Sequence, residues 1–126
     1  MSLKLTVKPD EYLVVNGCVI KNRGNRAVIS IENHADVLRG KDLLEPQDVK
    51  TPLQKAYYDI QTALIDARQR EELVPKIQAA LGKLAAVLGG YAQCLIFEAA
   101  NNVSVGNFYL ALKAVGKANK LESTAA

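Results

Sequence analysis

The chain has 126 residues, about half of them hydrophobic, and a formal net charge of +3 at pH 7. No apolar run approaches the ~20 residues that a membrane span needs. A single histidine, two distant cysteines and the absence of clustered carboxylates argue against a zinc site built by the protein alone.

The first ten residues lack the long apolar segment of a secretory signal, so we expect a cytoplasmic protein. In that compartment Cys18 and Cys94 are expected to stay reduced. We expect them to be small buried hydrophobic residues rather than the two halves of a disulfide.

The first 44 residues have the pattern of short strands joined by tight turns. Leu3, Leu5 and Val7 alternate with polar residues, which is the period of a half-buried strand. Asn16 and Gly17 form a strong hairpin signal, because both residues tolerate the positive φ of a type I′ turn. The five expected strands are 3–8, 12–15, 18–21, 26–31 and 36–39. Their spacing predicts an antiparallel meander or small barrel.

A linker with two prolines, residues 45–52, closes the β region. Thr51 followed by Pro52 predicts a helix start, since a capping hydroxyl precedes a proline at the first helical position. Apolar residues then recur at helical spacing and form one stripe, namely Leu53, Tyr57, Ile60 and Leu64.

The remaining sequence predicts two or three further helices. Pro75 either kinks the first helix or begins the second, and the sequence leaves this open. A second apolar stripe begins at Leu73 and ends before the glycine pair 89–90, which we predict to be a C-cap. A third helix over 91–101 is expected to end at a pair of asparagines, and Ser104 is expected to cap a fourth. The stripes either pack on one another or form a dimer or partner interface.

Strands followed by helices predict the α+β class rather than alternating α/β. The expected organisation is a β-rich subdomain over 1–44, a linker over 45–52, a helical subdomain over 53–121 and a frayed tail over 122–126. The β-rich part is the expected site of RNA binding and dimerisation.

The sequence offers no catalytic constellation. His34 is the only histidine, and it lies in the polar run "ENHAD", where a turn residue is the expected interpretation. No phosphate-binding glycine loop follows a strand. We therefore expect neither an enzyme nor a cofactor.

Positive charge is concentrated in the β-rich part. Residues 1–41 carry seven lysines and arginines against four acids, whereas residues 42–126 carry nine of each. Such asymmetry is a hint of a surface for nucleic acid. The alternative is a solvated outer face whose charged edge strand discourages aggregation. The candidate RNA-binding residues are Lys4, Thr6, Lys8, Lys21, Arg23, Arg26, Arg39 and Lys41.

Three segments carry a family resemblance that spacing alone does not supply. "MSLKLTVKPDE", "VVNGCVIKNRGNRAVISIENHADVLRGKDLL" and "TPLQKAYYDIQTALID" together resemble the FlbT family of alphaproteobacterial flagellum-biosynthesis regulators. The resemblance is strong over about the first 66 residues. It is looser afterwards, where "NFYLALK" at 107–113 resembles the family's last helix.

A second resemblance concerns the first 44 residues, which are similar in order to the carbon storage regulator family of RNA-binding proteins. Leu3, Leu5 and Thr6 match the opening of that family's first strand, and Val37 and Arg39 match the close of its last strand. In that family the first and last strands of opposite protomers form the RNA-binding edge. This resemblance points to Lys4, Thr6 and Arg39. Asp10 stands where that family has a turn glycine, and Leu38 also departs from its pattern.

The resemblance to FlbT implies a post-transcriptional regulator that associates with the 5′ untranslated region of flagellin mRNA and changes its translation or stability. It implies no catalysis and no cofactor. A small flagellar regulator, FlaF, acts opposite or alongside members of the family. We expect a homodimer or higher homo-oligomer that grips RNA with its β part. The rival hypothesis is an adaptor that binds FlaF or flagellin through its helical half and affects RNA indirectly.

Overall fold

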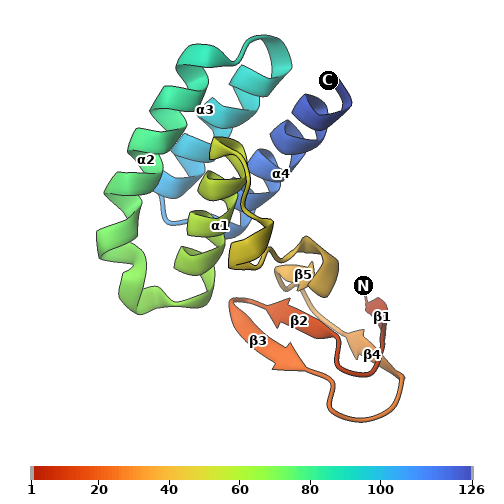
Figure 1. The fold of residues 1–126 in the computed structure, drawn as a ribbon. Helices are drawn as coiled ribbons and strands as arrows, with labels where there is room; N and C mark the ends of the chain where they lie inside the picture. Colours follow the sequence, from red (N-terminus) through yellow and green to blue (C-terminus); the bar gives the residue numbers. More distant parts are fainter. Residues whose placement is uncertain (1, 126) are drawn as a thin grey trace. The chain divides into compact units, whose positions relative to one another are not determined.

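The structure, a computed structural model, describes residues 2–125. The chain folds into two compact units, one ending at Leu43 and the other beginning at Leu44. The first unit is built of strands and the second of helices (Figure 1). This confirms the predicted α+β class. We describe each unit by itself.

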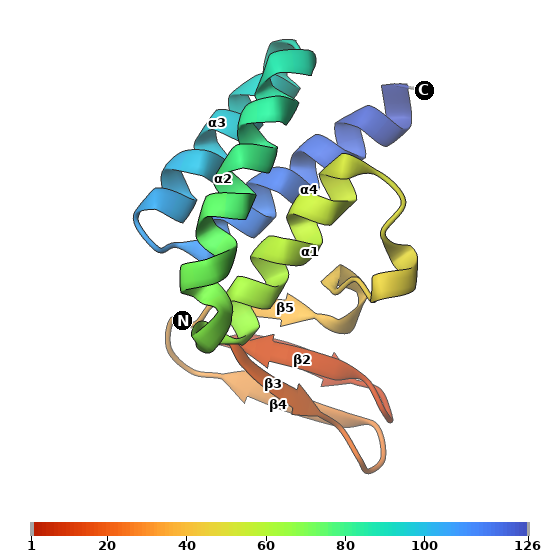
Figure 2. The ribbon, with the colours of Figure 1, turned by 60° about the vertical axis from the view of Figure 1, so that its left-hand side comes forward.

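The β unit holds five short antiparallel strands in two small sheets (Figure 2). In the first sheet β1 pairs with β4, and in the second the order is β3-β2-β5. The strands are β1 (Leu3–Val7), β2 (Tyr12–Val15), β3 (Cys18–Lys21), β4 (Ala27–Ile31) and β5 (Val37–Arg39). Their bounds lie within a residue of the expected ones because alternation and turn residues both mark the ends.

Two tight turns depend on left-handed backbone. Asn16 and Gly17 have φ of 50° and 81°, as the predicted hairpin between β2 and β3 requires. Asp10, between β1 and β2, has φ of 63°, although its Cβ makes this conformation costly. The carbonyl of Asn22 accepts a hydrogen bond from the Asp10 backbone N–H at 2.7 Å, which helps to hold the turn.

The core of the β unit lies on the inner face of β1. Leu5 and Val7 are buried there together with Leu13 of β2. Three half-buried residues, Val15, Ile31 and Val37, pack against this cluster. Because side chains alternate along a strand, the intervening residues of β1 face outward.

Four α-helices form the described part of the helical unit. They are α1 (Pro52–Ile65), α2 (Arg70–Val87), α3 (Gly90–Ser104) and α4 (Phe108–Ala125). The predicted start of α1 is confirmed: Thr51 Oγ1 accepts a hydrogen bond from Gln54 N, with Pro52 in the first turn. The largest fully buried side chains of this unit are Ile60, Ile77, Leu81, Leu95, Ile96, Leu112 and Val115.

Pro75 lies inside α2, which begins five residues earlier at Arg70. Neither a break nor a helix start occurs at the proline. Pro75 is the sixth residue of α2 and lies beyond the first four N–H groups, so its missing N–H takes one intrahelical hydrogen bond from the carbonyl of Glu71. A short 3-10 turn, Ala67–Gln69, supplies the actual boundary between α1 and α2.

The expected end of the third helix and the expected cap of the fourth were wrong. α3 continues to Ser104, because Asn102 Nδ2 donates to the carbonyl of Glu98 one turn back instead of ending the helix. The cap of α4 is Asn107, whose Oδ1 accepts a hydrogen bond from Leu110 N at 3.1 Å. Ser104 Oγ instead donates to the carbonyl of Asn101.

Three further features differ from or extend the expectations. Cys18 and Cys94 are free, as expected, but both are exposed rather than buried. α4 takes in residues 122–125, where we expected a tail, and residue 126 lies outside the described residues. Among the described residues, no helix combines the length and apolar character needed to cross a membrane.

Candidate nucleic-acid interface

The outward face of the β1–β4 pair gathers several of the predicted residues. Lys4 lies opposite Ser30 and Thr6 opposite Val28, while Leu5 and Val7 between them point into the core. The last pair of the ladder is Val7 and Ala27. Lys8, after Val7, and Arg26, before Ala27, lie next to this pair and are both exposed. We call this surface the basic face; its residues are Lys4, Thr6, Lys8, Arg26, Val28 and Ser30.

The basic face combines three kinds of group. Lys4, Lys8 and Arg26 supply cationic donors, Thr6 and Ser30 supply hydroxyls, and Val28 is 70% exposed. One acid lies beyond the end of the ladder: Glu32, which accepts a hydrogen bond from Ser30. A second acid, Glu11, accepts a hydrogen bond from the backbone N–H of Lys8, so three cations lie near two acids at this surface.

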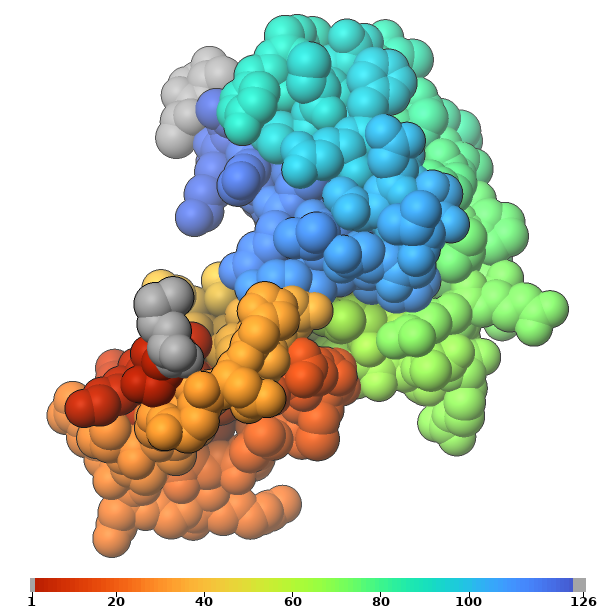
Figure 3. Space-filling model, turned by 180° about the vertical axis from the view of Figure 1, so that it is seen from behind, coloured from red at the N-terminus to blue at the C-terminus, as the bar shows by residue number. Residues whose placement is uncertain are grey.

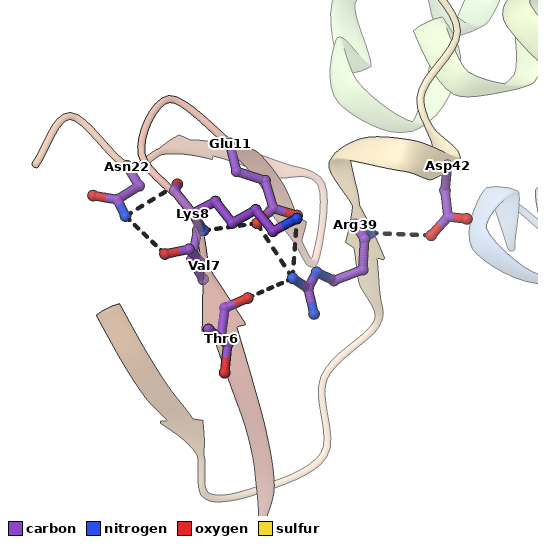
Figure 4. A network of polar contacts seen from close by, with 7 residues as sticks. All are labelled: Thr6, Val7, Lys8, Glu11, Asn22, Arg39 and Asp42. Atoms are coloured by element: carbon purple, nitrogen blue, oxygen red, sulfur yellow. Dashed lines mark hydrogen bonds and ion pairs between the residues drawn. The ribbon is translucent and has the colours of Figure 1, made fainter. Parts of the chain in front are cut away.

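Asn22 organises the end of the basic face, although it is itself uncharged. Its Nδ2 donates to the carbonyls of Val7 at 3.0 Å, Lys8 at 3.2 Å and Asn25 at 2.9 Å. Its Oδ1 accepts a hydrogen bond from Gly24 N. One side chain thus ties the turn after β3 to the end of β1, and Figure 4 shows its contacts with β1. This brings the turn that carries Arg23 and Arg26 to the turn that carries Lys8.

Arg39, one of the three residues to which the resemblance to the carbon storage regulator family points, has intramolecular partners. Its Nη2 donates to the carbonyl of Thr6 at 2.6 Å and to Glu11 Oε2 at 3.1 Å (Figure 4). Its Nε is buried and has no hydrogen-bond partner. The contacts join β5 of one sheet to β1 of the other, so we call Arg39, Thr6 and Glu11 the clamp.

The clamp has a defined electrostatic state. The backbone N–H of Lys8 donates to Glu11 Oε1, and this bond, with Arg39, holds the pKa of Glu11 below its ordinary value. Partial burial acts in the opposite direction. Glu11 is therefore ionised near neutral pH and faces the guanidinium. The side chains of Arg39 and Glu11 are only 29% and 21% exposed.

The other predicted residues lie away from this centre. Lys21, at the end of β3, places its Nζ 5.3 Å from the centroid of the Tyr12 ring, its cross-strand neighbour. Lys41 is exposed in a 3-10 turn, Gly40–Asp42, that follows β5. The structure thus gathers Lys4, Thr6 and Lys8 with Arg26 on one face, whereas Lys21 and Lys41 are not part of it.

Sequence reasoning missed three residues of the site. Val28 and Ser30 share the basic face only because β4 pairs with β1, which is not its neighbour in the chain. Asn22 lies in the turn "NRGN" at 22–25, and nothing in the sequence of that turn distinguishes it as a residue of the site. The one available signal was the alternation within 26–31, which puts Val28 and Ser30 on one side of a strand.

This arrangement can hold anions but shows no catalytic cluster among the described residues. His34 is exposed, with Nε2 3.7 Å from Asp36, and has the character of a turn residue. The described residues contain no group of three or more side chains able to hold a metal ion. Lysine and arginine beside hydroxyls on a ribbon suit phosphates, and an exposed apolar side chain suits a base. The geometry defines a small α+β protein whose β unit has three exposed cationic side chains on one face.

The chain belongs to the FlbT family. The family model described as "Flagellar protein FlbT" matches residues 3–125, nearly the whole chain. The resemblance seen in the first 66 residues therefore extends over the helical unit as well.

Several curated proteins are similar to the chain. The flagellum biosynthesis repressor protein FlbT of Caulobacter vibrioides is 34% identical over 88 residues, which cover 70% of this chain and 62% of the relative. A probable flagellum biosynthesis repressor from Bradyrhizobium diazoefficiens is 30% identical over 90% of this chain and 77% of the relative. A similarly described protein of Mesorhizobium japonicum is 26% identical over 98% of this chain and 84% of the relative.

The match spans about three fifths of the length of the Caulobacter relatives. No solved structure matches the chain.

Proposed function

We propose that this protein is a cytoplasmic, post-transcriptional regulator of flagellin synthesis that binds the 5′ untranslated region of flagellin mRNA and changes its translation or stability. Family membership supports a role in flagellum synthesis, and its relatives are described as repressors. The observation that carries RNA binding is the basic face, where Lys4, Lys8 and Arg26 lie on one side of a two-stranded ribbon.

The basic face is suited to a single-stranded leader rather than to a duplex groove. Lys4 and Lys8 are four residues apart, so the ribbon spans about 13 Å between them. Positive side chains hold phosphates, and the exposed Val28 offers an apolar contact for an unstacked base. Arg23, Lys21 and Lys41 add charge around this centre in the proposal.

Arg39 has a different role in this proposal. Its guanidinium is engaged by Thr6 and Glu11, so we assign it as a positioning residue that holds β1 against β5. In this way it fixes the position of the β1 backbone, which carries Lys4 and Thr6.

Two further parts of the proposal concern partners. Association of two copies through the β unit is supported by β3, an edge strand whose residues, Val19 and Ile20 among them, are all exposed. A protein partner such as a FlaF-type regulator is assigned to the helical unit. The charge balance of residues 42–126 supports this, since a phosphate-binding surface would carry excess lysine or arginine.

The test is direct binding of a flagellin leader RNA to the full chain. Substitution of Lys4, Lys8 and Arg26 together by alanine removes three candidate phosphate contacts. The slope of log affinity against log salt, which is negative, should become less steep by about 2, because each contact to single-stranded RNA contributes about −0.7 to it. The matched control substitutes three lysines of the helical unit, Lys50, Lys55 and Lys83.

An equal slope in the triple variant and its control would remove the basic face from the proposal. No RNA binding even at low salt, together with stable association with a FlaF-type regulator, would instead decide for the adaptor hypothesis. Light-scattering mass measurement of the purified chain tests the homodimer.

A further inference from the structure

The outer side of α3 exposes two aromatic side chains and a cysteine, which nothing in the described chain covers. Tyr91 is 62% exposed and Phe97 54% exposed, and Cys94 between them is exposed as well. Glu98 is the only charged residue in the whole of α3. In Figure 3 the surface of α3 is coloured cyan and blue.

These exposed side chains do not belong to the hydrophobic core of the helical unit. The inward face of α3 already has its own apolar residues, including Leu95, Ile96 and Ala99, all of them buried. A single exposed apolar residue on a helix needs no explanation, but a contiguous apolar patch marks an interaction surface. Tyr91, Cys94 and Phe97 follow one another at three-residue spacing and therefore share one exposed side of α3, on which Glu98, Asn101 and Ser104 are exposed as well.

The patch continues onto α4. Tyr91, Glu98 and Val105 follow one another at seven-residue intervals and therefore lie along one line of α3 and its C-cap. Leu110 and Leu121, eleven residues apart, lie on one side of α4, and both are exposed.

The α3–α4 hairpin brings the two lines together. The helices pack against each other and are joined by the turn around Gly106. Tyr91 and Leu121 each lie fifteen residues from that glycine, whereas Val105 and Leu110 flank it. Apolar pairs thus mark both ends of a surface about 22 Å long at 1.5 Å per helical residue. We call it the α3–α4 face; its residues are Tyr91, Cys94, Phe97, Glu98, Val105, Leu110, Lys113, Lys117 and Leu121.

The charge of the α3–α4 face selects its occupant. Lys113 and Lys117 share the outer side of α4 with Lys120 one turn on, while Glu98 is the only acid. Lys113 Nζ lies 5.4 Å from the centroid of the Tyr109 ring, which fixes it beside the patch. Two copies meeting face to face would bring their lysines together, and this like-charge contact is unfavourable. A helix with apolar residues on one side and acids on its flanks complements both features.

We propose that the α3–α4 face is the docking site for an acidic amphipathic helix of a partner protein, about four turns long. The apolar side of that helix lies on Tyr91, Phe97 and Leu110, and its acids lie beside Lys113 and Lys117. This inference rests on the part of the proposed function that assigns a protein partner to the helical unit. It is independent of RNA binding by the β unit.

The probe is a fluorescent synthetic peptide of about 18 residues, five helical turns, with leucines at i, i+3, i+4 and i+7 spacing and glutamates on the flanks. Its matched counterpart has lysine at every glutamate. Fluorescence anisotropy with the full chain should show binding of the acidic peptide and at least about tenfold weaker binding of the basic one. Phe97→Glu should weaken the acidic peptide by about tenfold or more, as expected when an aromatic anchor is lost. Lys117→Glu should also weaken it.

The matched controls are Val87→Glu and Lys83→Glu, which make the same changes at exposed positions of α2. Neither should alter peptide binding, and circular dichroism should confirm that all four variants fold. RNA affinity of Phe97→Glu should equal that of the wild type, so failure of the docking site is distinguishable from failure of the RNA proposal.

Four outcomes would overturn the inference. The first is no binding of the acidic peptide, and the second is equal binding of both peptides. The third is a wild-type dimer that Phe97→Glu converts to a monomer, which would make a second copy the occupant. Loss of RNA affinity in Lys117→Glu, with unchanged peptide binding, would assign the lysines to nucleic acid instead.

Discussion

One prediction separates two possible roles of Arg39. If Arg39 positions β1, its loss lowers the stability of the β unit, whereas if it contacts RNA directly, its loss lowers RNA affinity alone. Arg39→Ala removes the 2.6 Å hydrogen bond to the carbonyl of Thr6 and the ion pair with Glu11. Hydrogen bonds from charged groups contribute about 1.5–3 kcal/mol, and the partial exposure of Arg39 places the loss of the Thr6 bond at about 1–2 kcal/mol. The free energy of opening of the β unit should fall by that amount.

Hydrogen exchange measures this free energy locally, without requiring that the two units unfold together. A loss of about 1–2 kcal/mol lowers the protection of amides in β1 and β5 by a factor of roughly 5–30. Arg23→Ala is the control, because Arg23 is exposed in a turn and its loss should change stability by less than about 0.5 kcal/mol. Amides of α3 should be unaffected by either change.

Two results would refute the reasoning. Equal protection in Arg39→Ala and Arg23→Ala would mean that the clamp does not stabilise the β unit. Full protection in Arg39→Ala together with a large loss of RNA affinity would make Arg39 a direct RNA contact instead of a positioning residue.

Three further predictions follow from single contacts. Asp10→Gly should stabilise the β unit by about 0.5–1 kcal/mol in urea unfolding, since glycine adopts the φ of 63° without the Cβ penalty, whereas Asp10→Ala should not. Gln61→Leu should lower the free energy of unfolding of the helical unit by about 2 kcal/mol. The reason is that the buried Gln61 amide accepts a hydrogen bond from the N–H of Leu44 at 2.8 Å and donates one to its carbonyl at 2.9 Å. An unchanged melting temperature would contradict this. Hydrogen bonds from Arg68 and Gln69 lower the pKa of Asp66 to about 2, so its contribution to stability is complete above the ordinary value near 3.8 and is lost as the pH falls toward 2. Urea midpoints at both ends of that range should therefore differ less in Asp66→Asn than in the wild type.

Local sequence signals predicted most elements of the fold. Alternation in Leu3–Val7 and the glycine turn after Asn16 are short-range properties, and they marked the strands to within a residue. The Thr51–Pro52 start was equally readable, since the cap and the proline act within one turn. The local signals failed at Asn102 and Ser104, because such residues can either mark a helix end or hydrogen-bond within a helix. Here the side chain of each donates to a backbone carbonyl of its own helix.

The candidate site was predictable only in its composition. The excess of basic residues before residue 42 is a property of the sequence, and so is the placement of Lys4 and Thr6 on the polar side of a strand. Which other residues join them was decided by the pairing of β1 with β4, whose paired residues are 20 to 28 positions apart in the chain. No local pattern encodes that choice, because it depends on how the apolar faces of all five strands bury one another.

The sequence by itself therefore determined the class of fold, the family and the uneven charge of this protein. The tertiary structure decided which charges are available. Arg39 was the strongest candidate in the sequence, but folding places it against Thr6 and Glu11, where a guanidinium that has lost part of its water needs acceptors. Tyr91 and Phe97, which resemble core residues in the sequence, remain outside because other residues of α3 already fill the inward face.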